Sequence, residues 1–215
     1  MIKLFHPFNL LLDEINEGEV VIVEYNTAAN VDLLPFQFLE FEDSVLIVMG
    51  DRLSLKLLSL LKVLKEKIEI RGSIILISNN PIEFEGFEIS TIKPVTLNTI
   101  LSEIYGFIKD RGLDDGVVVI WGTEQMGLYV DLSDAIKEFA KLKSSMPGMT
   151  VVEFINFEAV DEKDLAIIES AATTIFRLEG KLSERGIERR IAILKSINPI
   201  KKEVAEFEPW NLGLR

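Results

Sequence analysis

Short apolar runs alternate with longer segments in which apolar residues recur at helical spacing. The short runs cover 19–25, 44–49, 72–78, 117–121 and 150–155, and 87–95 gives a weaker strand signal. Their β-branched composition is typical of strands buried on both faces. The longer segments predict helices over 32–40, 53–68, 96–111, 131–143 and 161–170, after a short one over 9–15. The alternation predicts an α/β fold, with a mostly parallel doubly wound sheet and helices on both faces.

The pattern changes over the last part of the chain. Residues 173–178, 190–194 and 202–207 alternate between apolar and polar positions, as antiparallel strands do. We therefore expect one domain over 1–215, made of an α/β core over 1–170 and a C-terminal β-hairpin region over 171–215.

Composition narrows the class of protein. A hydrophobic content of 48% with 27% charged residues is globular, and no apolar stretch is long enough to predict a membrane span. The first residues lack the pattern of a secretory signal, which favours a cytoplasmic location. A net charge of −12 repels phosphate backbones, so the sequence argues against nucleic-acid binding. Abundant Glu, Lys and Ile with few Gln are typical of heat-adapted proteins.

Few chemical groups are available for catalysis or for metal binding. The chain has no cysteine, which excludes disulfides, thiolate metal sites and a cysteine nucleophile. Its only histidine, His6, lies beside Pro7 near the start of the chain, where a surface or capping role is the simpler interpretation. We predict no metal and no cofactor.

Several segments resemble the RecA-type ATPases of the KaiC-like group. Gly18 to Glu24 followed by Gln37-Phe38-Leu39 is similar to the strand and helix that flank their phosphate loop, and the spacing matches without a gap. Leu11 to Ile15 resembles the segment before that strand. The stretches 174–179 and 189–195 resemble their terminal hairpin. The overall pattern is also similar to an archaeal family of degenerate members of this group, and the resemblance implies a RecA-like fold.

The phosphate loop of that group is replaced. Such a loop needs the pattern G-x-x-x-x-G-K-[ST], in which glycines let backbone amides surround phosphates and a lysine reaches them. Aligned with this pattern, Tyr25 and Asn30 stand at the two glycines, Val31 at the lysine and Asp32 at the hydroxyl residue. Asn26 follows the first position. A carboxylate where phosphates would approach opposes their binding.

Three further family positions differ. Trp121 stands where the resemblance implies a magnesium-organising aspartate at the end of a strand. Asp51 is a displaced candidate for the catalytic glutamate. In the terminal Lys-x-Arg, Lys195 keeps the lysine but Ile197 replaces the arginine. The sequence therefore predicts a degenerate domain, or pseudo-ATPase.

Two functions remain open, with residual nucleotide binding as a weaker third. The first is a non-catalytic scaffold that acts through self-assembly or a protein partner, since RecA-like proteins commonly form oligomers. The second is a small-molecule-binding protein or enzyme that uses a rebuilt crevice between 26–30 and 122–127, with Asp32, Asp51, Glu124 and Lys195 as candidate residues. The alternative to a crevice is that Tyr25 and Trp121 fill that space.

Overall fold

The structure is a computed structural model that describes residues 15–64, 69–113, 115–146, 148–184 and 186–196, and the backbone of 204–206. The predicted helix over 9–15 falls outside these ranges except for its last residue. The described strands form one nine-stranded sheet in the order β4-β3-β2-β5-β6-β1-β7-β8-β9. The strands from β4 to β7 in this order are parallel, and β8 and β9 are antiparallel additions.

The strands follow the apolar runs of the sequence. Their bounds are β1 Val20–Tyr25, β2 Ser44–Met49, β3 Ser73–Ile77, β4 Ile89–Ile92, β5 Val117–Trp121, β6 Thr150–Asn156, β7 Thr174–Ser183, β8 Gly186–Lys195 and β9 Val204–Glu206. Nearly all side chains of β1, β2, β3, β5 and β6 are buried, because helices cover both faces of this part of the sheet. The predicted fold class is confirmed.

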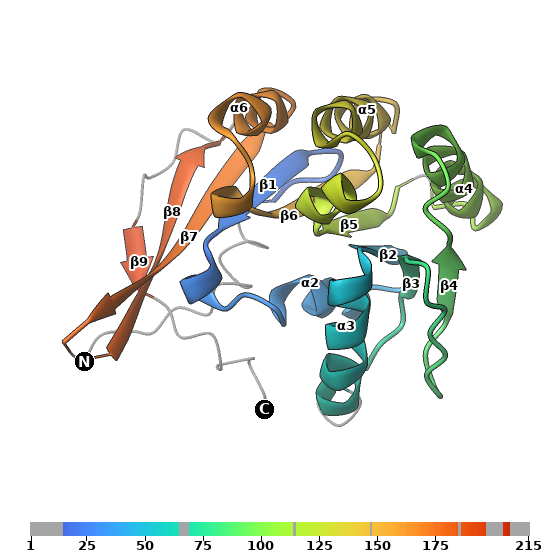
Figure 1. Cartoon of the computed structure of the whole chain (residues 1–215), viewed down its shortest axis with the longest axis horizontal. Coiled ribbons are helices and arrows are strands. Elements are labelled where there is room, and N and C mark those ends of the chain that lie inside the picture. Colours follow the sequence, from blue (N-terminus) through green and yellow to red (C-terminus); the bar gives the residue numbers. More distant parts are fainter. Residues whose placement is uncertain are drawn as a thin grey trace.

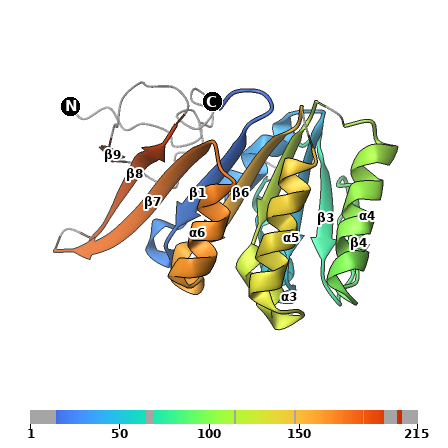
Figure 2. The same ribbon diagram turned by 90° about the horizontal axis from the view of Figure 1, so that it is seen from above.

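Helices form a layer on each face of the sheet (Figures 1 and 2). One layer contains α4 Leu97–Asp110, α5 Leu132–Ser144 and α6 Glu162–Ser170. Each of these helices begins at a side-chain cap, provided by Thr96, Asp131 and Asp161. The opposite layer contains α2 Leu34–Gln37 and α3 Asp51–Leu64. The capped layer is therefore regular, whereas the opposite one begins with a single turn.

The segment predicted as a helix over 32–40 is shorter and irregular. It contains α2 and then the 3₁₀ turn η2 Phe38–Glu40, and all residues of α2 are buried. The carbonyl of Leu39 accepts hydrogen bonds from the backbone N–H groups of Arg71 (2.8 Å) and Gly72 (3.0 Å). These bonds connect the turn to the start of β3. The Leu39 carbonyl therefore accepts tertiary hydrogen bonds, and not the hydrogen bond that would continue the helix.

The C-terminal hairpin is longer than its apolar pattern predicts. Strands β7 and β8 stay paired as far as Ser183 and Gly186, and the hairpin projects from the body of the molecule (Figure 1). Leu182 and Ile187 face each other near its tip, with exposed fractions of 78% and 46%. The pairing of the outer part thus rests on backbone hydrogen bonds and this exposed apolar pair.

Candidate functional site

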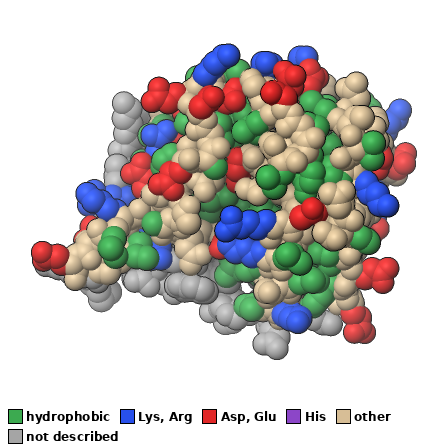
Figure 3. All heavy atoms as spheres, viewed as in Figure 1, with side chains coloured by type: hydrophobic (Ala, Val, Ile, Leu, Met, Phe, Trp, Pro, Cys, Tyr) green, Lys and Arg blue, Asp and Glu red, His purple; other side chains and the backbone are tan. Residues whose placement is uncertain are grey.

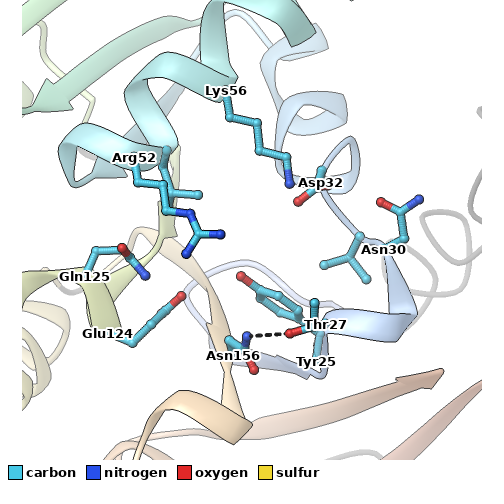
Figure 4. Close-up of a pocket in the computed structure, with 11 residues that line it drawn as sticks. Tyr25, Thr27, Asn30, Asp32, Arg52, Lys56, Glu124, Gln125 and Asn156 are labelled. Carbon is cyan, nitrogen blue, oxygen red and sulfur yellow. Dashed lines mark hydrogen bonds and ion pairs between the residues drawn. The ribbon is translucent and has the colours of Figure 1, made fainter. Parts of the chain in front are cut away.

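A pocket of about 360 Å³ opens at the carboxyl ends of β1, β2, β5 and β6 (Figure 4). Open α/β sheets bind ligands at this edge. The pocket is lined by Tyr25, Thr27, Asn30, Val31, Asp32, Arg52, Leu53, Lys56, Glu124, Gln125 and Asn156. The two segments predicted to form a crevice, 26–30 and 122–127, both contribute to it.

The loop after β1 is a closed turn that is attached to the hairpin. Its 3₁₀ turn, η1 Thr27–Ala29, is capped by Asn26, whose side-chain oxygen accepts the N–H groups of Ala29 (3.0 Å) and Gly180 (2.8 Å). Arg189 adds a hydrogen bond to the carbonyl of Ala29 (3.1 Å). A Cβ at Gly180 would lie 2.2 Å from the Ala28 backbone, so only glycine permits this approach. The hairpin therefore holds the loop in place.

Three backbone amides at the start of this loop have partners within the protein. The N–H of Asn26 donates to the carbonyl of Leu178 (3.3 Å), and the N–H of Thr27 donates to the carboxylate of Glu158 (3.2 Å). An anion-binding nest needs successive amides that point at one centre. Here the amides of Asn26, Thr27 and Ala29 point to three different acceptors, so these three amides do not converge on one centre as in a phosphate cradle.

Two aromatic residues form the base of the pocket. Tyr25 lines it, and the fully buried Trp121 lies beneath and donates its indole N–H to the Tyr25 hydroxyl (3.2 Å). Phe36 packs edge-on against Trp121, with ring centroids 5.8 Å apart. Burial raises the pKa of Tyr25 well above its usual value, so the hydroxyl is neutral. Trp121 thus fills space under the site, while Tyr25 lines it.

The basic side chains of the pocket come from α3. Lys56 forms an ion pair with Asp32 at 2.5 Å. Among the described residues Arg52 has no ion pair or hydrogen-bond partner, and its guanidinium group points into the pocket toward Glu124 and Tyr25 (Figure 4). Figure 3 shows a group of basic side chains near the middle of this face. The pocket therefore contains one neutralised cation and one unpaired cation.

Glu124 provides the pocket's acidic group. Its pKa is raised from 4.5 to about 7, chiefly because burial disfavours the charged form and secondarily because Glu153 is close. The backbone N–H groups of Glu124 and Asn156 and the Gln125 side chain act in the opposite direction. The Oε2 atom of Glu124 is enclosed and has no hydrogen-bond partner. Near neutral pH this carboxyl group is therefore close to half protonated.

A second carboxylate, Glu153 of β6, lies behind the pocket. It forms a buried ion pair with Lys143 of α5, and the two side chains are 1% and 2% exposed. Thr123 donates its hydroxyl to the other oxygen of Glu153 (2.6 Å). Each oxygen of Glu153 thus has a partner within the protein.

Two residues predicted for the crevice lie outside the pocket lining. Asp51 accepts hydrogen bonds from the Ser78 hydroxyl and the Asn79 backbone N–H (2.9 Å), which lower its pKa. Lys195 donates to the carbonyls of Glu169 and Ala172 at the end of α6. Of the four predicted crevice residues, the structure brings Asp32 and Glu124 to the pocket.

The sequence analysis missed Arg52 and Lys56. They lie one turn apart on α3, after the buried strand β2 ends at Met49. The sequence feature that could have found them is a pair of cations in the first turns of a helix that follows a buried strand. Such a helix begins at the carboxyl edge of the sheet, where ligands bind. Among the described residues no group of acids and histidines could hold a metal ion, and no helix there is long and apolar enough to cross a membrane.

Solved structures with the same arrangement of strands and helices identify the fold. A KaiC-like protein from Pyrococcus horikoshii matches with a TM-score of 0.63 and 15% identity, over 90% of this chain and 87% of that one. The chain has a KaiC-like, RecA-type fold. A second P. horikoshii protein, from a structural study, matches with a TM-score of 0.60 and 18% identity over 92% and 97% of the two chains.

The flagellar accessory protein FlaH from Methanocaldococcus jannaschii matches less well, with a TM-score of 0.51 and 16% identity over 88% of this chain and 84% of that one. Neither a protein-family model nor a curated protein sequence matches the chain. At these identities the KaiC-like neighbours establish the fold alone.

Proposed function

We propose that this protein is a KaiC-like scaffold that has lost the ATP site and acts by binding copies of itself or a protein partner. The observation that carries the proposal is the buried Trp121, at the position where the resemblance implies a magnesium-organising aspartate. Its indole N–H is bonded to Tyr25, which stands at the first position of the former phosphate loop. An indole ring and a phenol cannot hold Mg²⁺, whose ligands are oxygens of carboxylates, phosphates and water.

The loop after β1 supports the same proposal. Val31, at the position of the phosphate-binding lysine, is 2% exposed. The nearest basic side chain on α3, Lys56, is paired with Asp32. A triphosphate in this pocket would face the Asp32 and Glu124 carboxyl groups, and the amides of Asn26, Thr27 and Ala29 are bonded elsewhere.

Calorimetric titration of the purified chain with Mg-ATP at physiological salt tests the lost site. We expect no saturable heat at millimolar nucleotide and no release of phosphate. The matched variant Asp32→Ser removes the carboxylate and frees Lys56, and weak binding gained by this variant alone would support the proposal. Saturable binding and hydrolysis by the unmodified chain would contradict it.

The projecting hairpin is the surface we propose for assembly. It combines the exposed pair Leu182 and Ile187 with basic residues, whereas the chain as a whole carries a net charge of −12. The hydrophobic side chains near its tip are visible in Figure 3. Around the tip, Lys181, Arg189 and Arg190 alternate with Glu179, Glu184 and Glu188, so the exposed apolar pair is the feature that supports assembly. A cytoplasmic location and a heat-adapted origin stay predictions from the sequence.

Light scattering across micromolar concentrations tests self-association. We expect a species larger than the monomer that Leu182→Ser combined with Ile187→Ser converts to monomer, with only a small loss of melting temperature, because both side chains are exposed and contribute one cross-strand pair. Leu128→Ser, at an exposed leucine on the 3₁₀ turn η3 Thr123–Leu128, is the control and should leave the assembly unchanged. A monomer at every concentration would limit the proposal to a different partner protein.

A further inference from the structure

The pocket has two side chains of opposite charge that form no ion pair with each other or with any other described residue. Arg52 reaches in from α3 on one wall, and Glu124 lies on another wall, in the turn after β5. Arg52 forms no ion pair among the described residues, and Oε2 of Glu124 is enclosed without a hydrogen bond. Figure 4 shows the guanidinium group and the carboxyl group facing the same space. Arg52 is exposed, but the buried Oε2 of Glu124 would normally be satisfied, so a cation and an acid that face one cavity without pairing point to a ligand that carries both charges.

We propose that this pocket binds a small α-amino acid, with its carboxylate on Arg52 and its ammonium group on Glu124. This goes beyond the scaffold role, because it assigns a ligand to the space that remains at the former nucleotide site. Arginine binds carboxylates in a bidentate manner, and an ammonium group donates hydrogen bonds to a carboxyl group that faces the same cavity.

Ligands with one kind of charge fit less well. A phosphate or a simple carboxylate would pair with Arg52 but would meet the carboxyl groups of Glu124 and Asp32. A simple amine would pair with Glu124 but would leave Arg52 unpaired and would add a second positive charge. A dipolar molecule satisfies both groups and leaves the net charge of the pocket unchanged.

The size and polarity of the pocket agree with this ligand. A volume of about 360 Å³ is at the small end of ligand sites. The remaining wall has side-chain amides from Asn30, Gln125 and Asn156 and the hydroxyl of Thr27. These groups both donate and accept hydrogen bonds, which favours an amino acid whose own side chain is polar.

Proton release would accompany binding of an ammonium group. The groups that face Glu124 are Arg52 from α3, Tyr25 from β1 and Glu153 from β6, and Glu153 is neutralised by Lys143. Tyr25 stays neutral, and in the free protein the pKa of Glu124 is about 7. An ammonium ligand would lower this pKa, so binding at pH 7 would release about half a proton and would tighten as the pH rises. A carboxylate or phosphate alone would have the opposite linkage.

The first experiment is a thermal-shift screen of the full chain with the proteinogenic L-amino acids, each at about 10 mM, because ligand binding raises the melting temperature by mass action. For each amino acid that stabilises the chain, the matched acid without the amino group and the matched amine without the carboxylate are titrated by calorimetry. L-alanine, for example, is compared with propanoate and ethylamine. We expect each half-ligand to bind at least about tenfold more weakly than the amino acid.

Variants then assign the two poles. Arg52→Ala and Glu124→Gln should each weaken binding by about tenfold or more, and the second should abolish proton release measured in buffers of different ionisation enthalpy. Lys62→Ala, an exposed cation on the same helix outside the pocket, is the control and should bind as the unmodified chain does. No stabilisation by any amino acid, or equal binding of a half-ligand, would overturn the proposal. ATP titration tests the scaffold proposal separately.

Discussion

Two carboxyl groups at the carboxyl end of the sheet have opposite environments. Glu153 of β6 has a cation, Lys143, and a hydroxyl, Thr123, so both of its oxygens are bonded inside the protein. Glu124 lines the pocket instead, with one oxygen enclosed and unpartnered and a pKa raised to about 7. The protein supplies a partner for each oxygen of Glu153, whereas Oε2 of Glu124 has no hydrogen-bond partner in the protein.

This difference separates a structural group from a candidate ligand-binding group. Burying an ion pair costs desolvation energy, which is offset only when the two charges are well placed and hydrogen-bonded. The buried Glu153 carboxylate therefore requires its partners Lys143 and Thr123. A carboxyl group with one buried, unpartnered oxygen and no ion pair lowers stability, and proteins tolerate this at sites that bind ligands. Substitutions around Glu153 and at Glu124 should therefore change the free energy of unfolding by different amounts and with a different dependence on pH.

Removal of the partner cation should have the largest effect. Lys143→Met leaves Glu153 buried and unpaired, and we expect a loss of about 3–5 kcal/mol in the free energy of unfolding, measured with urea at pH 7. Lys141→Met, on the same helix, removes an exposed cation that pairs with Glu138, and should cost less than about 1 kcal/mol. Equal effects of the two substitutions would remove the distinction between a structural pair and a surface pair.

Removal of the hydroxyl should have a smaller effect. Thr123→Val keeps the shape of this fully buried side chain but takes one donor from Glu153, and a hydrogen bond to a charged group contributes about 1.5–3 kcal/mol. Thr123→Ser keeps the donor and loses a methyl group. Urea unfolding should therefore rank the serine variant above the valine variant, and the reverse order would show that packing dominates at this position.

The sheet and the capped helical layer could be predicted from the sequence because their signals are local. Each buried strand is a short β-branched run, and α5 begins at Leu132, directly after its cap Asp131, within one residue of the predicted start. The helix predicted over 32–40 was too long, because the Leu39 carbonyl accepts hydrogen bonds from Arg71 and Gly72, which lie far along the chain. The outer part of the hairpin was missed because its side chains are mostly exposed and carry a weak apolar pattern.

The pocket could be predicted only in part, for a similar reason. Loop residues such as Asn30 and the acid Glu124 follow buried strands directly, which places them at the carboxyl edge. Arg52 lies on a helix where single-sequence patterns cannot distinguish a solvated cation from one that enters a pocket. Asp51 and Lys195 are held elsewhere by Ser78 and by backbone carbonyls, contacts that no local spacing encodes.

The pH dependence of stability tests the environment of Glu124, with the smallest expected effect. Its pKa is 4.5 in the unfolded chain and about 7 in the folded protein, so the folded protein retains a proton that the unfolded chain loses. Stability should therefore fall as the pH rises from about 4.5 to 7 and then level off. Glu124→Gln should remove this slope and should be more stable than the unmodified chain above pH 7, by about 2 kcal/mol or less because the side chain is partly exposed.

The difference between the two pH profiles isolates Glu124 from another group that titrates in the same range. Burial also raises the pKa of Glu24 on β1 to about 7, despite its ion pair with Arg177 at 2.6 Å. Glu24 is present in both proteins, so its contribution cancels in the comparison, and the variant should keep a residual slope. Glu103→Gln, on the exposed face of α4, is the control and should reproduce the unmodified profile. Parallel profiles for Glu124→Gln and the unmodified chain would mean that Glu124 is ionised in the folded protein at all these pH values, and that its environment does not differ from that of an ordinary surface acid.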